Sequence, residues 1–225
     1  MNNQIYSLNI ILNVFLTTLV GMNLIKKNIS LLIIGIFHLV GIIGFLTLPD
    51  TFKSLSPVNL LLSICLVLLA AEKNKKLYII LMSIALIGFL IEVIGVKTGI
   101  IFGNYQYGEA FGFSLFSVPI LIGFNWAILL YGTSQFCKFK NRIVNVLFSS
   151  FLMTFIDFFI EHIASRYDFW YWENNQIPIQ NYAAWFLISV GLNLLFQKTL
   201  INSVNYTAKG FYIIQLLFFV ILNTV

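Results

Sequence analysis

The sequence predicts an all-α integral membrane protein, a polytopic bundle of about eight transmembrane helices. Hydrophobic residues make up 60% of the 225 residues and charged residues only 9%, whereas a soluble domain carries about 25% charged residues. Apolar runs of roughly 20 residues, the length at which a helix crosses a bilayer core, recur along the whole chain. A backbone in lipid must satisfy its own hydrogen bonds, so these runs are expected to be helices. We therefore expect a single transmembrane domain over residues 1–225, with a motif-bearing core at 88–198.

The eight predicted spans follow one another with short loops between them. The first has no basic segment before it and no small-residue cleavage site, so it is expected to be a retained helix and not a signal peptide. The other spans follow from the apolar runs, with ends placed to within about two to four residues. In chain order the predicted spans cover about 4–25, 30–48, 56–71, 77–96, 115–136, 143–164, 181–198 and 209–224.

Basic residues gather on one side of this arrangement. Of the thirteen lysines and arginines, only Lys53, Lys97 and Arg166 fall on the opposite side. The positive-inside rule makes the basic side cytoplasmic, so both termini are expected outside, in a multi-pass protein of the bacterial cell membrane. The basic charge is spread over four short loops, which favours anchoring to anionic lipid over nucleic-acid binding. The sequence gives no indication of the oligomeric state. The basic-side residues are Lys26, Lys27, Lys73, Lys75, Lys76, Lys138, Lys140, Arg142, Lys198 and Lys209.

Acidic residues have the opposite distribution. All except Glu72 map to the outer loops or to the outer halves of spans. Acidic residues contribute little to orientation, and a carboxylate inside a span is by default a candidate for a functional site. Three acids meet that condition: Glu92, Asp157 and Glu161. Asp157 and Glu161 are four residues apart, which places them on one face of a helix.

Glu92 and Glu161 belong to a predicted weak internal repeat. In both copies an acid ends a helix, an aromatic-X-aromatic loop follows, and a proline leads to Asn and Trp in the next helix. Both helix pairs begin on the predicted cytoplasmic side, which favours a parallel repeat about an axis along the membrane normal. The alternative is that aromatic residues and proline simply favour the membrane interface. The first copy contains Glu92, Tyr105, Tyr107, Pro119, Asn125 and Trp126, and the second contains Glu161, Trp170, Trp172, Pro178, Asn181 and Trp185.

Acids among aromatic rings suggest carbocation chemistry. Burial in an apolar pocket disfavours the charged form of a carboxyl group, and each carboxylate repels the next, so one acid can keep a proton to donate. The faces of the surrounding rings can stabilise a cation by about 0.5 to 2 kcal/mol each. Protonation of an electron-rich alkene gives a tertiary cation, which water, an internal double bond or proton loss then removes. No cofactor is required for this chemistry, and the sequence offers no set of metal ligands.

The second half of the chain resembles a family of membrane proteins of carotenoid biosynthesis, which includes carotenoid 1,2-hydratases and bisanhydrobacterioruberin hydratases. The resemblance extends from Glu92 to Phe186 and rests on two stretches and the acids between them. The stretches are EVIGVKTGIIFGNYQYGEAFGFSLFSVPILIGFNWAILLYG and FWYWENNQIPIQNYAAWF.

The resemblance implies addition of water to the terminal isopropylidene group of a carotenoid, such as γ-carotene or an acyclic carotenoid, without a cofactor. Glu92, Asp157 and Glu161 are among the matching positions and are the expected catalytic residues. We expect one of Asp157 and Glu161, on their shared helical face, to act as the acid and the other as the base that orients water, with Glu92 as the third candidate. The resemblance implies substrate-binding roles for Tyr105, Tyr107, Asn125, Trp126, Trp170, Trp172, Asn181 and Trp185. One departure is His162, which stands where the family commonly has proline after the second acid.

Three other hypotheses remain open. A cyclase would share the cation and end by ring closure. A proton-coupled transporter would also bury acids, although transport sites usually lie near the membrane midplane between broken helices. In the third hypothesis the carboxylates only pair with Arg166, Lys97 and His162 at the membrane surface.

Overall fold

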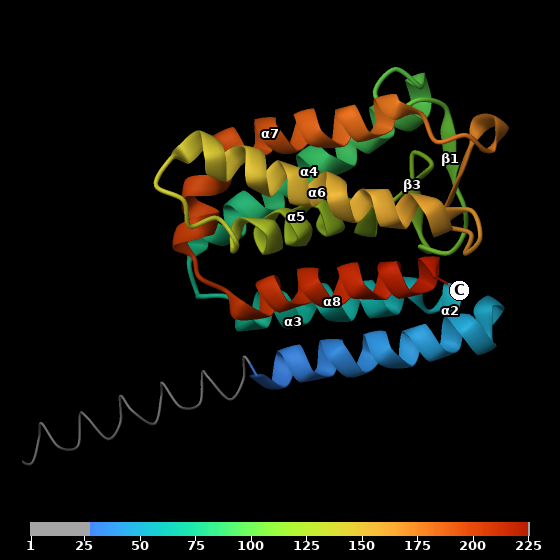
Figure 1. Ribbon diagram of the computed structural model, residues 1–225, viewed down its shortest axis with the longest axis horizontal. Coiled ribbons are helices and arrows are strands. Elements are labelled where there is room, and N and C mark those ends of the chain that lie inside the picture. Colours follow the sequence, from blue (N-terminus) through green and yellow to red (C-terminus); the bar gives the residue numbers. More distant parts are fainter. Residues whose placement is uncertain (1–27, 225) are drawn as a thin grey trace, which may run out of the picture.

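The computed structural model describes residues 28–224 and is an all-α bundle with four short strands at one end (Figure 1). The predicted span 4–25 and the basic residues Lys26 and Lys27 lie outside the described residues. Each of the other predicted spans corresponds to a helix. The helices are Asn28–Thr47, α2 Pro49–Ser54, α3 Ser56–Ala70, α4 Lys75–Thr98, α5 Ile120–Ser134, α6 Arg142–Ala164, α7 Ile179–Asn202 and α8 Tyr206–Asn223. The strands are β1 Tyr105–Tyr107, β2 Ser114–Leu115, β3 Val118–Pro119 and β4 Trp170–Trp172, and β4 is followed by the 3-10 turn Glu173–Asn175.

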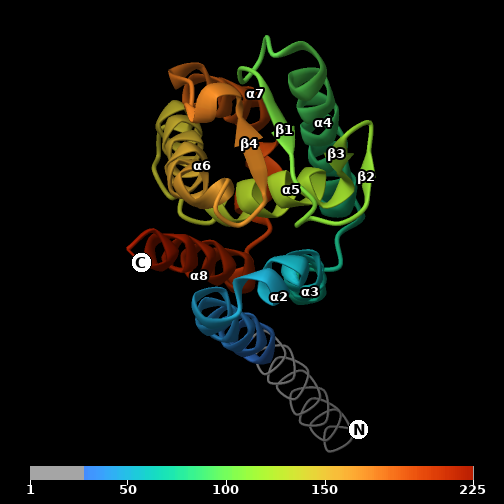
Figure 2. The ribbon, with the colours of Figure 1, turned by 90° about the vertical axis from the view of Figure 1, so that its right-hand side faces the viewer.

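The helices are arranged in layers, and α5 lies at the centre. Figure 2 shows α4, α5, α6 and α7 grouped together, with α3 and α8 beneath them and the helix Asn28–Thr47 below those two. α5 contacts α3, α4, α6, α7 and α8. Among the described residues, five helices are long and apolar enough to cross a membrane, whereas α3 and α5 have 15 residues each. The prediction of a helical membrane bundle is confirmed, and the chain is a multi-pass membrane protein.

Asparagine side chains begin three of the helices. Asn74 accepts a hydrogen bond from the backbone N–H of Lys76, and Asn141 and Asn205 cap α6 and α8 in the same way. Such caps satisfy N–H groups that have no partner inside the helix, which matters more where little water is present. Asn205 also donates to the backbone carbonyl of Val67 and so ties α8 to α3. The three capped helix ends all lie at the end of the bundle away from the strands (Figure 1).

The predicted span 115–136 is wrong at its beginning. Residues 114–119 form the hairpin β2–β3, and helix α5 starts only at Ile120. Two features prevent an earlier start. Phe116 and Ser117 have positive φ angles of 56° and 68° and make the turn of the hairpin, and Pro119 at the helix N-cap has an extended conformation. Because α5 is surrounded by other helices, its backbone needs no lipid-spanning length of its own.

The strands β1 and β4 join the two copies of the internal repeat. They pair in antiparallel register, with Tyr105 opposite Trp172 and Tyr107 opposite Trp170. The first copy is α4–β1–α5 and the second is α6–β4–α7, and within each copy the two helices contact one another. Successive side chains of a strand point to opposite faces, so the outer two residues of each strand share one face. The aromatic-X-aromatic pattern therefore directs two rings from each strand toward the helices.

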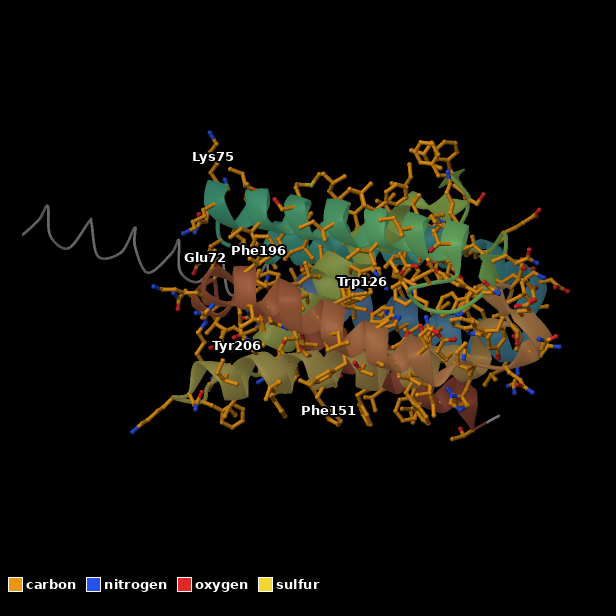
Figure 3. All side chains as sticks on the ribbon, turned by 90° about the horizontal axis from the view of Figure 1, so that it is seen from above. Glu72, Lys75, Trp126, Phe151, Phe196 and Tyr206 are labelled. Carbon is orange, nitrogen blue, oxygen red and sulfur yellow. The ribbon has the colours of Figure 1, made fainter. Side chains whose placement is uncertain are left out.

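Charge is separated along the bundle. The loops at 71–74, 135–141 and 203–205 lie together at the end opposite the strands, and Figure 3 shows Glu72 and Lys75 there. Most of the described basic residues lie in or beside these loops, whereas Lys53, Lys97 and Arg166 lie near the strand end. The charge distribution along the chain thus appears in space as two distinct ends of one bundle. Which end faces the cytoplasm stays a prediction.

Candidate active site

A cavity of about 320 Å³ lies between the layers of the bundle, toward the strand end. This volume is in the range typical of small-molecule sites. Residues from the helix Asn28–Thr47, from α3 to α8 and from β1 and β4 line it. The wall is mostly apolar, and the predicted acids Glu92, Asp157 and Glu161 all lie on it. Phe37, Val40 and Val58 also line the cavity and are about half exposed, so the described part of the chain leaves the cavity open sideways.

Glu92 is held by three aromatic hydrogen-bond donors. Its Oε2 accepts hydrogen bonds from the hydroxyls of Tyr105 at 2.5 Å and Tyr107 at 2.8 Å, and its Oε1 accepts one from the indole N–H of Trp126 at 2.9 Å. Both tyrosines come from β1 and the tryptophan from α5. Every donor faces the carboxyl group, which is the arrangement that stabilises a carboxylate.

Glu161 has the same kind of environment in the second copy. Its Oε2 accepts hydrogen bonds from the indole N–H groups of Trp170 at 2.9 Å and Trp172 at 2.6 Å, both from β4. Its Oε1 accepts a hydrogen bond from the side-chain amide of Asn181 at 2.9 Å. The two acids at the helix ends are therefore each fixed by the two inward rings of the strand that follows.

Asp157 differs from the two glutamates because one of its oxygens is free. Its Oδ2 accepts a hydrogen bond from Asn181 at 3.0 Å, so the amide of Asn181 bridges Asp157 and Glu161. Its Oδ1 is buried and has no hydrogen-bond partner among the described residues. Asp157 lines the cavity and is fully buried. A carboxyl group that lines an apolar cavity and has one oxygen without a hydrogen-bond partner is suited to hold a proton and deliver it to a bound molecule.

The two repeat copies are not equivalent at this position. Four residues before Glu161 stands Asp157, whereas four residues before Glu92 stands Gly88. A Cβ atom at Gly88 would lie 2.9 Å from Cβ of Trp126, so the ring of Trp126 occupies that space. The first copy thus has a buried glutamate without a second acid. The pair of acids is a property of the second copy alone.

Trp126 lies behind the cavity wall and not on it. Its side chain is fully buried, Figure 3 shows it in the interior of the bundle, and it is absent from the cavity lining. Its ring stacks on Trp185, which does line the cavity. The sequence analysis places Trp126 among the substrate-binding residues, and the geometry instead gives it contacts to Glu92 and Trp185. The remaining predicted binding residues line the cavity: Tyr105, Tyr107, Asn125, Trp170, Trp172, Asn181 and Trp185.

The hypothesis that the acids only pair with nearby basic residues is not supported. Among residues 28–224, the one ion pair joins Lys53 and Asp50 at 2.9 Å, on α2. His162 is exposed, and its Nδ1 lies 2.7 Å from the backbone carbonyl oxygen of Phe158. The imidazole thus bonds to the backbone of its own helix, whereas Glu161 bonds to Trp170, Trp172 and Asn181.

The tyrosines of β1 stay neutral over a wide pH range. Burial and the neighbouring carboxyl group of Glu92 raise the pKa of Tyr105 far above its ordinary value, and the same causes raise the pKa of Tyr107. Both hydroxyls therefore keep their protons and act as donors to Glu92.

Several polar residues of the cavity were missed by the sequence analysis. Ser56, Asn59 and Ser63 line it from α3, Gln215 from α8 and His38 from the helix Asn28–Thr47. The spacing of the three α3 residues, at i, i+3 and i+7, puts them on one helix face and was the available signal. His38 bonds to the backbone carbonyl of Ile34 at 2.8 Å and contacts the rings of Phe211 and Phe218.

Fold and site together define a polytopic membrane protein with an acid and aromatic pocket between its helices. The model of the family described as "Carotenoid biosynthesis protein" matches residues 55–225, and the chain belongs to this family. The chain is also similar to the bisanhydrobacterioruberin hydratase of Haloarcula japonica, with 26% identity over 136 residues. That match covers 55% of this chain and 45% of the relative, so the chain matches less than half of the relative's length. No solved structure matches this chain.

Proposed function

We propose that this protein adds water to the terminal isopropylidene double bond of a carotenoid, by protonation to a tertiary cation. The observation that carries the proposal is Asp157, which lines an apolar cavity beside two other carboxyl groups and whose buried Oδ1 has no hydrogen-bond partner among the described residues. Membership of a carotenoid biosynthesis family supports a carotenoid as the substrate, and the similar archaeal protein is named a hydratase. Because carotenoids are long polyenes, a cavity of about 320 Å³ takes one end of the molecule while the rest lies in the opening.

In the first step Asp157 acts as the acid. The O–H bond of protonated Asp157 breaks, and the proton adds to the alkene carbon that leaves the positive charge on the dimethyl-substituted carbon. The carboxylates of Glu92 and Glu161, each fixed by three hydrogen bonds, then provide preorganised negative charge near the cation. Rings that line the cavity, such as Trp185, add about 0.5 to 2 kcal/mol each.

The second step ends the reaction. A water oxygen forms a bond to the cationic carbon and loses a proton to Glu161, which acts as general base, and a tertiary alcohol results. The proton then passes from Glu161 to Asp157, the two acids that Asn181 bridges, so that Asp157 is protonated for the next cycle. The net change is addition of one water molecule, with no change of oxidation state.

Expression in cells that accumulate lycopene or γ-carotene tests the function. The pigment should gain the mass of one water per modified end, and isotopic water should label the new hydroxyl group. A pigment of unchanged mass with a new ring would make the protein a cyclase, and an untouched pigment would favour the transporter. Label from molecular oxygen would indicate a hydroxylase.

Variants of the acids complete the test. Asp157→Asn and Glu161→Gln keep the shape of the side chains and remove the acid or base, so product should fall about 10²- to 10⁴-fold. Glu109→Gln is the matched control, because Glu109 is an exposed acid outside the cavity. Immunodetection of the membrane fraction should find all three variants at the level of the unmodified protein. Equal product from Asp157→Asn would contradict the assignment of the acid.

A further inference from the structure

Four residues that line the cavity each have a buried polar atom without a hydrogen-bond partner among the described residues: Ser56 Oγ, Asn59 Oδ1, Ser63 Oγ and Gln215 Oε1. None of them belongs to the two repeat copies. A buried polar atom without a partner is costly, and in native proteins such atoms are generally satisfied by water or a ligand. The four residues share the cavity, so a molecule inside it is a partner that small rotations of these side chains can reach.

Other serines of this protein behave differently. Ser83 and Ser150 donate to the backbone carbonyls four residues earlier in their helices, at 2.9 Å each. That is the usual way in which a hydroxyl is satisfied inside a membrane helix. Ser63 is 1% exposed and does not make such a bond. Its hydroxyl is therefore available to a molecule in the cavity.

The positions of these groups trace a path. Ser56, Asn59 and Ser63 lie on one face of α3 and extend about 10 Å along it, since a helix rises 1.5 Å per residue. Ser56 is the first residue of α3 and is separated from the end of α2 by one residue. The ion pair of α2 between Lys53 and Asp50 includes an aspartate with a 91% exposed side chain. An exposed ion pair marks the water-facing end of the bundle. The path starts there and runs inward.

The inner end of the path meets the candidate active site. Two further residues of the cavity wall have a buried oxygen without a partner, Oδ1 of Asn125 and Oδ1 of Asp157. The polar atoms of α3 and α8 thus line the side of the cavity formed by the lower layer, and the acids line the side formed by α4 and α6. A small molecule such as water that is bound along α3 can therefore move to a cation held beside Asp157.

We propose that Ser56, Asn59, Ser63 and Gln215 form a water path, a row of hydrogen-bonding sites that supplies the water consumed in hydration. This inference rests on the proposed function. The row accepts and donates hydrogen bonds to water while the rest of the wall, apolar and aromatic, holds the hydrocarbon. Without the row the cation has no nearby water and loses a proton to a carboxylate, which restores an alkene.

Reaction in heavy water distinguishes capture of the cation by water from its return to an alkene. In D2O the acid carries deuterium, which adds to the alkene carbon. A cation that then loses a different proton, from that carbon or from a methyl group of the cationic carbon, returns to alkene with a carbon-bound deuterium in the recovered carotenoid. A captured cation appears instead as alcohol. The ratio of alcohol to deuterated carotenoid therefore measures water capture independently of protonation, with the full-length protein in proteoliposomes and lycopene as the probe.

Ser63→Ala, Asn59→Leu and Gln215→Leu should each lower this ratio about five- to tenfold, the effect of losing roughly one hydrogen bond to the reacting water. Deuterium uptake itself should persist. Ser189→Ala is the matched control, because Ser189 is also buried with an unpartnered hydroxyl but lies outside the cavity lining. Its ratio should equal that of the unmodified protein.

The other outcomes overturn the inference. An unchanged ratio in all three variants would show that the row does not supply water. An unchanged ratio with a changed dependence on the concentration of a hydroxylated carotenoid would show that the row binds a hydroxyl group of the substrate. If the unmodified protein produces neither alcohol nor deuterated carotenoid, the proposed function itself fails and the water path fails with it.

Discussion

The indole rings of Trp126 and Trp185 lie face to face, with centroids 4.0 Å apart and planes inclined by 16°. Each tryptophan stands seven residues after the proline that precedes its helix, Pro119 in the first copy and Pro178 in the second. Equivalent residues of the two copies thus meet in the middle of the bundle. The stack joins the copies among the helices, and the strands β1 and β4 join them at one end.

The stack predicts unequal effects of two similar substitutions. Trp126→Leu and Trp185→Leu both remove the ring contact, which is worth about 0.5 to 1.5 kcal/mol. Only Trp126→Leu also removes a hydrogen bond to Glu92, and a hydrogen bond to a charged group adds about 1.5 to 3 kcal/mol. Thermal unfolding in detergent should therefore give a lower midpoint for Trp126→Leu. Equal midpoints would argue against the importance of that bond.

The two acids of α6 should fail in different ways. Asp157→Asn removes the proposed proton donor, so both hydration and deuterium uptake from D2O should drop to trace levels. Glu161→Gln leaves the donor and removes the base, so deuterium uptake should exceed hydration by a larger factor than in the unmodified protein. Mass spectrometry of the recovered carotenoid reports both quantities. The reverse pattern would exchange the two roles.

Replacement of Asn181 should lower the activity more than the loss of either of its hydrogen bonds alone would, because its side chain bridges two acids. Asn181→Ala removes donors to both Asp157 and Glu161. Activity should fall at least about tenfold, since each hydrogen bond to a charged group is worth about 1.5 to 3 kcal/mol. Asn193→Ala is the matched control on α7, a buried asparagine with two hydrogen bonds outside the cavity. Similar activity in the two variants would contradict the bridging role.

The tyrosines of β1 predict a loss of stability at high pH. The pKa of Tyr105 is raised above its ordinary value of 10.0 in the folded protein. The neutral form is therefore favoured by folding, and this contribution is fully present below pH 10 and is lost as the pH rises further. Melting temperatures measured from pH 8 to 11 should fall above about pH 10. The double variant Tyr105→Phe, Tyr107→Phe should show a smaller fall in melting temperature over the same pH interval.

The membrane orientation can be tested with reporter fusions. A reporter after Lys140 should report the cytoplasm and one after Asn175 the opposite side, since the basic loops lie at one end of the bundle and β4 with its following turn lies at the other. The same compartment for both fusions would contradict the topology and the placement of the cavity near the outer side.

The sequence predicts the helices and the acids because both produce strong local signals. A long apolar run determines a membrane helix almost alone, and a carboxylate such as Asp157 inside such a run is conspicuous. The pairing of β1 with β4 could not be predicted, because each strand has only three residues and its partner is distant in the chain. The polar face of α3 was missed because Ser56 and Ser63 are also common as structural residues in helices. The position of Trp126 behind the cavity wall could not be predicted either, because a repeat motif indicates the neighbourhood of a residue and not the layer in which its ring packs.

The lateral opening of the cavity determines which measure of substrate concentration sets the reaction rate. In the described part of the chain the half-exposed residues Phe37, Val40 and Val58 line the cavity, so a carotenoid dissolved in the bilayer can enter it without passing through water. The encounter is then two-dimensional, and its rate depends on the number of carotenoid molecules per lipid and not on their concentration in the bulk sample. Adding empty lipid to fused vesicles at constant amounts of protein and pigment should slow turnover by surface dilution. The same dilution with buffer should leave the rate unchanged.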